Sequence, residues 1–120
     1  MQKKVLILDD DAMALFSLES ILTNEGYLVN CIGSSDIVDL TIKAFVPDLI
    51  ILDIRLKDGD GREICNKLKK TAGTRHIPIV MLTALSYDEI GEIECSADAI
   101  IGKSFDSENL LRTIADLLAG

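Results

Sequence analysis

The sequence predicts an α/β fold in which a doubly wound, five-stranded parallel sheet lies between two layers of helices. Short apolar runs of strand character alternate five times with stretches whose apolar residues recur at helical spacing. The connections between them are short, which favours right-handed crossovers and helices on both faces of the sheet. A length of 120 residues matches one compact domain, and we expect that domain to span residues 1–120.

The first half of the chain is expected to contain three strands and two helices. The strands are expected over residues 5–8, 28–32 and 49–52, and the helices carry apolar residues from Leu15 to Leu22 and from Ile37 to Phe45. Ser35 or Asp36 can cap the second helix through a side-chain oxygen, and Pro47 ends the connection that follows. Residues 49–52 are apolar without alternation, which is typical of a strand buried on both faces at the centre of a parallel sheet.

The second half continues the alternation with two strands and three helices. The helices are expected around residues 64–68, over residues 87–95 and from Leu110 to Leu118, and the strands over residues 77–82 and 99–102. A turn at Gly73 and Thr74 separates the first of these helices from the next strand. Asp106 or Ser107 can cap the last helix. The whole chain is therefore an alternation of strands and helices, without a linker or a low-complexity tract.

The composition argues against nucleic acid and membranes as direct partners. The chain carries 20 acidic and 12 basic side chains, and its formal net charge of −8 opposes phosphate backbones and anionic lipids. No apolar run approaches the ~20 residues that cross a bilayer. Cys31, Cys65 and Cys95 are odd in number and match neither a CxxC pair nor a metal-binding spacing. We therefore expect a cytoplasmic protein with reduced thiols.

Chemically active side chains follow the predicted strands at the points where the strands stop. They are Asp9, Asp10 and Asp11 after the first strand, Asp53 after the third, Thr83 after the fourth and Lys103 after the fifth. The carboxyl ends of parallel strands share one edge, and the ligands of open α/β sheets bind outside that edge. Each residue also has an ordinary structural role, such as a helix N-cap for Asp11 or a solvated charge for Lys103. Those separate roles do not explain why acids, a hydroxyl and an ammonium group gather at one edge.

This grouping favours phosphoryl chemistry supported by a hard metal ion. Three carboxylates held together repel one another unless a cation joins them, and oxygen ligands without His or Cys favour Mg²⁺. A carboxylate beside such an ion can attack a phosphoryl group as a nucleophile. Asp53 is placed for that attack, and the hydroxyl of Thr83 and the ammonium of Lys103 are placed to receive the other phosphoryl oxygens.

Four motifs in order along the chain resemble the receiver domain of two-component response regulators. The matching segments are VLILDDDAM, LIILDIRLKDGDG, IVMLTA and AIIGKSF, and the resemblance covers essentially the whole chain. It implies a flavodoxin-like fold with strand order 2-1-3-4-5. It also implies a signalling domain that phosphorylates and dephosphorylates itself, rather than a conventional enzyme. The phosphoryl group would come from a histidine kinase or a His-phosphotransfer protein, and the output would reach a downstream effector protein or a fused domain.

The resemblance also implies a role for each site residue. Asp53 would be the phosphoacceptor. The implied Mg²⁺ ligands are Asp10, Asp53, the backbone carbonyl of Arg55 and, through water, Asp9. The implied phosphoryl-binding and switch residues are Thr83, Ala84 and Lys103. The aromatic switch residue that usually precedes the lysine by three positions is Ile100 here, so we expect a weakened signalling step.

The chain departs from the family pattern at further positions. Lys57 stands where receivers usually have proline and Gly59 where they have a bulky apolar residue, so we expect a looser loop over residues 57–61. Ser104 replaces the proline that usually follows the lysine, and we expect the bond before it to be trans. Leu85 cannot orient a hydrolytic water, so slow self-dephosphorylation is expected.

An enzymatic alternative uses the same first motif. The segment LILDDDAM also resembles the first motif of haloacid-dehalogenase-type phosphatases, in which Asp9 would be the nucleophile and Asp11 the acid. Those enzymes place a further acidic motif beyond the lysine strand, where only one helix remains here, and Asp53 would have no role. A flavin-binding module is disfavoured because the acids of the first loop would repel phosphate. A calcium-binding loop is disfavoured because Glu63 stands at the position where such a loop needs glycine. A receiver-like module that is never phosphorylated is disfavoured because the set of acids, Thr and Lys is complete.

Overall fold

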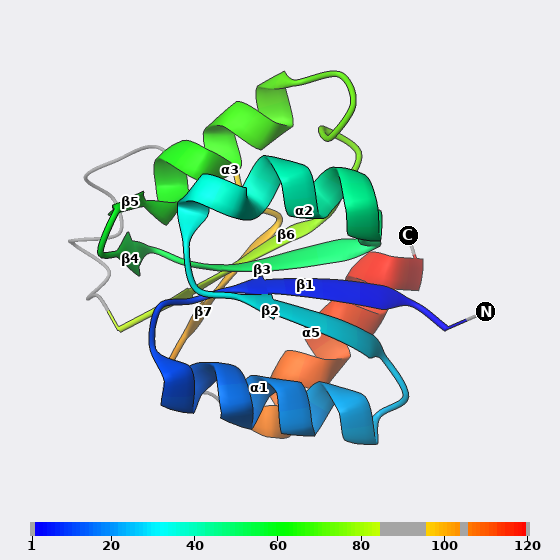
Figure 1. Cartoon of the computed structure of the whole chain (residues 1–120). Helices are drawn as coiled ribbons and strands as arrows, with labels where there is room; N and C mark the ends of the chain where they lie inside the picture. The colour runs from blue at the N-terminus through cyan, green and yellow to red at the C-terminus, as the bar shows by residue number, and fades with distance from the viewer. Residues whose placement is uncertain (1, 85–95, 104–105, 120) are drawn as a thin grey trace.

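The computed structural model of the protein describes residues 2–84, 96–103 and 106–119. In this part of the chain five parallel strands form one sheet in the order β2-β1-β3-β6-β7 (Figure 1). The strands are β1 (Lys4–Leu8), β2 (Leu28–Ile32), β3 (Leu49–Asp53), β6 (Ile79–Thr83) and β7 (Ala99–Gly102). Counted along the chain within this sheet, the order is 2-1-3-4-5, so the expected doubly wound, flavodoxin-like fold is confirmed.

Helices cover both faces of this sheet. They are α1 (Ala12–Asn24), the short 3₁₀ helix η1 (Ser35–Ile37), α2 (Val38–Phe45), α3 (Gly61–Lys70) and α5 (Ser107–Ala119). Helices α2 and α3 lie on one face, and helices α1 and α5 lie on the other (Figure 1). The helix that the sequence predicts over residues 87–95 lies outside the described residues.

The central strands contribute side chains to two separate hydrophobic cores. In β1, Leu6 and Leu8 belong to the core under α2 and α3, whereas Val5 and Ile7 belong to the core under α1 and α5, because successive side chains of a strand point to opposite faces. Every residue of β3 is buried, since this strand pairs with β1 on one side and with β6 on the other. The prediction of a central buried strand is confirmed, and Asp53 is its last residue.

The residues just beyond β3 form a small antiparallel ribbon of β4 (Arg55–Leu56) and β5 (Gly59–Asp60). The sequence predicted a looser loop here, without this pairing. A hydrogen bond from the N–H of Gly61 to the carbonyl of Ile54, at 2.7 Å, closes the ribbon. Glycine is needed at this position, because a Cβ on Gly61 would collide with the carbonyl oxygen of Asp53.

The turn of the ribbon is anchored to the connection between β2 and α2. The carboxylate of Asp58 accepts hydrogen bonds from Oγ of Ser34, at 3.1 Å, and from the N–H of Ser35, at 3.0 Å. Ser34 is also the N-cap of η1, since its Oγ accepts the N–H of Asp36 at 3.3 Å. The prediction of Ser35 or Asp36 as the cap is therefore wrong, because a turn of 3₁₀ helix precedes α2 and moves the cap upstream.

Within residues 2–84, 96–103 and 106–119, no helix has both the length and the apolar character needed to span a bilayer. Cys31 and Cys65 are not disulfide-bonded in the described part of the chain; the first is half-buried and the second buried. Cys95 lies outside the described residues.

Candidate functional site

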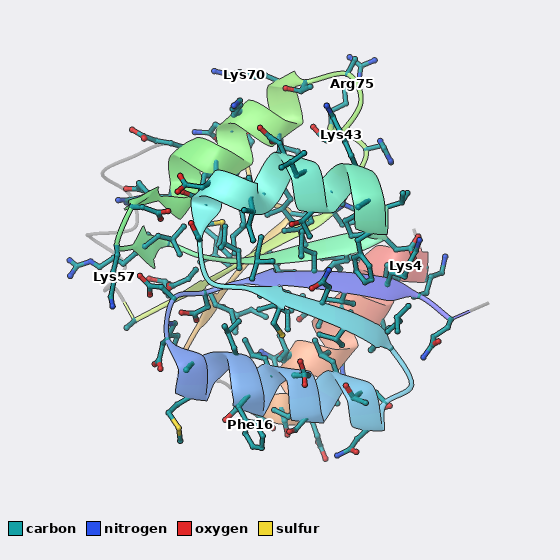
Figure 2. All side chains as sticks on the ribbon, in the orientation of Figure 1. Lys4, Phe16, Lys43, Lys57, Lys70 and Arg75 are labelled. Carbon is teal, nitrogen blue, oxygen red and sulfur yellow. The ribbon has the colours of Figure 1, made fainter. Side chains whose placement is uncertain are left out.

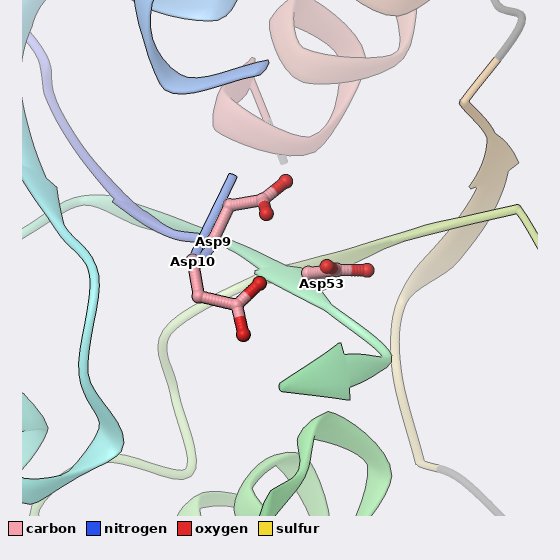
Figure 3. Close-up of side chains that lie close together, drawn as sticks. All are labelled: Asp9, Asp10 and Asp53. Atoms are coloured by element: carbon pink, nitrogen blue, oxygen red, sulfur yellow. The ribbon is translucent and has the colours of Figure 1, made fainter. Parts of the chain in front are cut away.

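Three carboxylates meet at the carboxyl edge of the sheet (Figure 3). Asp53 ends β3, and Asp9 and Asp10 follow β1, the strand beside it. One carboxylate oxygen of each residue lies within 4.8 Å of the other two. Asp9 and Asp53 are almost fully buried, with exposed fractions of 1% and 6%, and Asp10 is half-buried. The structure thus brings together three of the four acids that the sequence placed at this edge.

The backbone after β1 decides which of its acids join this cluster. The N–H of Asp9 donates to the carbonyl of Ile32 at 3.2 Å, which extends the pairing with β2 by one residue. Oδ1 of Asp9 accepts the N–H of Asp11 at 2.9 Å, so the turn holds the Asp9 carboxylate inward. Asp11 caps α1, since its carboxylate accepts the N–H of Met13 at 3.0 Å. Asp11 therefore has the role of an exposed N-cap and does not belong to the cluster.

A lysine that follows β7 joins the cluster from across the end of β6. Nζ of Lys103 lies 3.0 Å from Oδ2 of Asp9 and 3.1 Å from Oδ2 of Asp53. The N–H of Lys103 donates to the carbonyl of Thr83 at 2.7 Å, which fixes the start of the lysine side chain beside the end of β6. Burial disfavours the ammonium, but its attraction to the carboxylates of Asp9 and Asp53 outweighs that effect and raises the pKa of Lys103. Lys103 is therefore a charged donor at neutral pH.

The carboxyl of Asp53 holds its proton more tightly than an exposed aspartate does. Burial raises the pKa of Asp53, the hydrogen bond and charge of Lys103 lower it, and repulsion from Asp9 raises it again, which gives a net increase from 3.8 to about 6. At neutral pH the group is still mostly ionised, as a nucleophile must be. Its negative charge is poorly stabilised, so a bound cation lowers the free energy of the ionised form.

Other predicted site residues lie along the same rim. Thr83 ends β6 and is buried, one residue beyond Leu82, which is the register partner of Asp53 on the neighbouring strand. Ala84 follows Thr83 and is exposed. Arg55 begins β4 two residues after Asp53, so its backbone carbonyl lies in the ribbon that follows the cluster.

The predicted switch position lies on the edge strand of the sheet. Ile100 of β7 is in register with Met81 of β6, and 43% of its surface is exposed. Leu85 and Ser104, on which the expectations of slow dephosphorylation and of a trans bond depend, lie outside the described residues.

One contact of this site was not predicted from the sequence. The N–H of Lys57, in the turn of the ribbon, donates to Oδ2 of Asp10 at 2.6 Å. The available signal in the sequence is that Lys57 is not a proline, since proline has no N–H to donate. Figure 2 shows the Lys57 side chain pointing away from the body of the protein, so its backbone rather than its ammonium group contacts the site.

The cluster fits a hard divalent cation. Its candidate ligands are carboxylate oxygens, which Mg²⁺ prefers. The cluster brings three carboxylates together with the ammonium of Lys103, so a divalent cation can balance negative charge that this one ammonium leaves. No described residue donates a hydrogen bond to the buried Oδ2 of Asp9, although Lys103 forms an ion pair with it. That oxygen can therefore accept a hydrogen bond from a water on the ion.

A cavity of about 380 Å³ opens beside the cluster. Among the described residues its lining consists of Asp9, Asp11, Met13, Ala14, Ser17, Leu18, Leu82 and Lys103. A larger cavity of about 480 Å³ lies between α2 and α3, and its lining includes neither Asp9 nor Lys103. The smaller cavity is therefore the one that lies against the buried carboxylate of Asp9 and its lysine partner.

Comparison with known proteins agrees with this geometry. The family model of the response regulator receiver domain matches residues 5–115. The structure is similar to a putative response regulator from Chloroflexus aurantiacus J-10-fl, with a TM-score of 0.91 and 29% identity over 100% of both chains. It is similar to the signal receiver domain of a signal transduction histidine kinase from Syntrophus aciditrophicus, with a TM-score of 0.90 and 31% identity over 98% of this chain and 91% of that one.

A third similar structure is the BeF3-activated N-terminal receiver domain of RstA from Klebsiella pneumoniae. Its TM-score is 0.88 and its identity 28%, over 98% of this chain and 100% of that one. The family model covers nearly all of the chain, and the site at its sheet edge contains the acids and the lysine that the receiver motifs predict. This chain belongs to the family of response regulator receiver domains of two-component systems.

Proposed function

We propose that this receiver domain accepts a phosphoryl group on Asp53, in a Mg²⁺-dependent transfer from a histidine kinase or a His-phosphotransfer protein. The observation that carries the proposal is the environment of Asp53. Its buried carboxylate ends the central strand, lies 3.1 Å from Nζ of Lys103 and shares a cluster with Asp9 and Asp10. Membership of the receiver family supports the same conclusion, because phosphorylation and Mg²⁺ are typical of that family.

The residues that would hold the ion are Asp10, Asp53, the backbone carbonyl of Arg55 and, through water, Asp9. Once bound, Mg²⁺ would supply positive charge to the transferring oxygens. An indirect role suits Asp9, because its Oδ1 already accepts the N–H of Asp11 and its Oδ2 pairs with Lys103. Asp10 and Asp53 are each engaged through Oδ2, and a carboxylate has a second oxygen with which to bind a cation.

In the transfer, an oxygen of Asp53 would form a bond to phosphorus while the bond between phosphorus and the donor's histidine nitrogen breaks. The electron pair of the broken bond would stay with that nitrogen. Lys103 would contact a phosphoryl oxygen and retain its ion pair with Asp9. The Thr83 hydroxyl and the Ala84 N–H would donate hydrogen bonds to the remaining phosphoryl oxygens. These donors lie at the carboxyl ends of β6 and β7, at the same edge of the sheet as Asp53.

The output would be a change in a surface that binds a downstream effector protein or a fused domain. We propose that residues 1–120 form the receiver unit, of which the family model covers residues 5–115, and that the unit works in the cytoplasm. The similar structure from Syntrophus aciditrophicus is the receiver domain of a histidine kinase, which supports a kinase as the partner or the neighbour of this domain. The net charge of −8 supports a protein partner rather than nucleic acid or a membrane.

The phosphatase alternative, with Asp9 as the nucleophile and Asp11 as the acid, is not supported. The matching family model is that of the receiver domain. In addition, Asp11 is engaged as the N-cap of α1, and the two oxygens of Asp9 face the N–H of Asp11 and the ammonium of Lys103. Asp53 rather than Asp9 is the proposed phosphoacceptor.

Intact-mass spectrometry after incubation with a small acyl phosphate tests the proposal. The wild-type protein should gain the mass of one phosphoryl group when Mg²⁺ is present and none in excess EDTA, and Asp53→Asn should gain none. Asp11→Asn is a matched control, because asparagine also caps helices and the three-carboxylate cluster remains intact. Retention of the mass gain in Asp53→Asn together with its loss in Asp9→Asn would favour the phosphatase alternative.

A further inference from the structure

The hydrogen bond between Lys57 and Asp10 joins the ribbon to the carboxylate cluster. Its N···O distance of 2.6 Å is short for an N–H donor, as expected when the acceptor is an ionised carboxylate. Lys57 and Asp58 form the turn between β4 and β5, in which Leu56 pairs with Gly59. The donor is therefore a main-chain group in a defined turn rather than a flexible side chain.

The position of this donor is fixed from the opposite side of the turn. Asp58 accepts hydrogen bonds from the Ser34 hydroxyl and the Ser35 N–H, and Gly61 donates to the carbonyl of Ile54 at the base of the ribbon. The ribbon is thus held at its tip and at its base, and it presents the Lys57 N–H to Asp10 without help from a metal ion.

Asp10 needs such a partner more than the other two carboxylates do. Asp9 is held by the N–H of Asp11, and both Asp9 and Asp53 are held by Lys103, whereas Asp10 is half-buried and outside these ion pairs. A free carboxylate loses rotamer freedom when it binds a cation, and a hydrogen bond made beforehand reduces that loss. One oxygen of Asp10 accepts the Lys57 N–H, and the other remains for a ligand.

We propose that the backbone N–H of Lys57 is a positioning group for Mg²⁺, which orients the Asp10 carboxylate before the ion binds. This inference rests on the proposed function, since it takes Asp10 as a ligand of the ion. Receivers usually have proline at this position, and proline cannot make this hydrogen bond. The group therefore distinguishes this chain from receivers that follow the usual pattern.

Lys57→Pro and Lys57→Ala separate the N–H from the ammonium group. Both variants lose the same exposed charge, but only Lys57→Pro loses the N–H. Proline is favoured at the first central position of type I and type II turns, which Lys57 occupies between Leu56 and Gly59. Lys57 is not among the described residues with a positive φ, so its backbone does not exclude proline. Loss of a partner that orients a metal ligand typically weakens metal binding by about 10–100-fold. Mg²⁺ should therefore bind Lys57→Pro about 10-fold more weakly than Lys57→Ala in calorimetric titrations.

The outcomes distinguish this inference from the proposed function. If the wild-type protein does not bind Mg²⁺, the proposed function is wrong. If the wild-type protein binds Mg²⁺ and Lys57→Pro binds it as tightly as Lys57→Ala or more tightly, the positioning role is wrong. Lys57→Ala should retain the wild-type affinity or exceed it slightly, because it keeps the N–H and removes a cation near the site.

A second measurement does not depend on the folding of the proline variant. The amide proton of Lys57 in the metal-free wild-type protein should resonate downfield and exchange slowly, because it donates to a carboxylate. In Asp10→Ala the same proton should move upfield and exchange faster. An amide shift and exchange rate that do not respond to Asp10→Ala would show that the hydrogen bond is absent in solution and would overturn the inference.

Discussion

The ammonium nitrogen of Lys103 lies 3.1 Å from Oδ2 of Asp53, across the end of β6, the strand between β3 and β7. The pair is sheltered, since 27% of the Lys103 side chain and 7% of the Asp53 side chain are exposed. Ion pairs with little access to solvent are poorly screened, and the loss of either partner changes stability measurably. The site can therefore be tested by its stability as well as by its chemistry.

Replacement of Asp53, the proposed phosphoacceptor, should stabilise the metal-free protein. Because the pKa of Asp53 is raised from 3.8 to about 6, the folded protein binds this proton more tightly than the unfolded chain does. The free energy of unfolding therefore falls as the pH rises from about 4 to about 6, and it stays at the lower value above that window. Asp53→Asn removes the unfavourable charge and should raise the free energy of unfolding by about 1–2 kcal/mol at neutral pH, measured by urea denaturation in EDTA.

The same pair of proteins at about pH 4 is the control for this prediction. Asp53 is then protonated in the folded wild-type protein, so the difference between wild type and Asp53→Asn should shrink. An Asp53→Asn variant less stable than the wild type at neutral pH would show that the ion pair with Lys103 outweighs the burial of the charge.

Mg²⁺ affinity should fall as the pH drops below about 6. The ion must then displace a proton from Asp53, which is a ligand only in its ionised form. The apparent affinity should fall by up to about tenfold per pH unit below that pKa, as measured by calorimetric titrations at about pH 5 and about pH 7. An affinity that does not change between these conditions would show that Asp53 does not bind the ion.

Removal of the lysine should make the fold depend more strongly on Mg²⁺. Lys103→Met leaves the buried carboxylate of Asp9 without its counter-ion, which should lower the free energy of unfolding by about 2–3 kcal/mol. This loss is smaller than that for a fully buried ion pair, because the Lys103 side chain is partly exposed. A divalent cation can replace the missing charge. The increase in Tm on adding Mg²⁺ should therefore be larger in Lys103→Met than in the wild-type protein.

Lys67→Met is the matched control for the lysine prediction. Lys67 pairs with Asp39 at 3.8 Å, but the two side chains are 74% and 61% exposed, and such surface pairs contribute about 0–1 kcal/mol. This variant should have nearly the stability and the Mg²⁺ response of the wild type. If Lys103→Met behaves in the same way, the ion pairs at the site do not stabilise the fold.

Phosphorylation should couple weakly to the surface of β7 and α5. Ile100 has no hydroxyl with which to exchange partners and is already partly exposed, so its alternative rotamers differ little in free energy. We expect part of the response in the turn over residues 57–61 and in α3. Amide chemical shifts with and without beryllofluoride test this expectation. Large changes confined to residues 87–101 and α5, with residues 57–61 unaffected, would contradict it.

Patterning alone predicted the centre of the fold and several of the side chains that meet at its carboxyl edge. A strand buried on both faces needs consecutive apolar residues, so β3 can be read directly from the chain, and Asp53 interrupts that run where the strand ends. Asp9, Asp10 and Lys103 could be placed at the same edge because parallel strands share one direction. These inferences depend on local sequence and simple topology.

The ribbon and its contacts could not be predicted in this way. The contact between Asp58 and Ser34 spans 24 residues of sequence, and that between Lys57 and Asp10 spans 47. Any residue other than proline carries a backbone N–H, so residue type does not indicate which N–H will meet a carboxylate. The N-cap at Ser34 was missed for a related reason, since the 3₁₀ turn before α2 has no apolar periodicity of its own.

Chemical identification of the phosphorylated residue tests the central claim most directly. Borohydride reduces an aspartyl phosphate to homoserine, which tandem mass spectrometry locates in the digested protein. After incubation of the wild-type protein with Mg²⁺ and an acyl phosphate, we predict homoserine at position 53 and an unmodified aspartate at position 9. Homoserine at position 9, with Asp53 unmodified, would contradict the assignment of Asp53 as the phosphoacceptor.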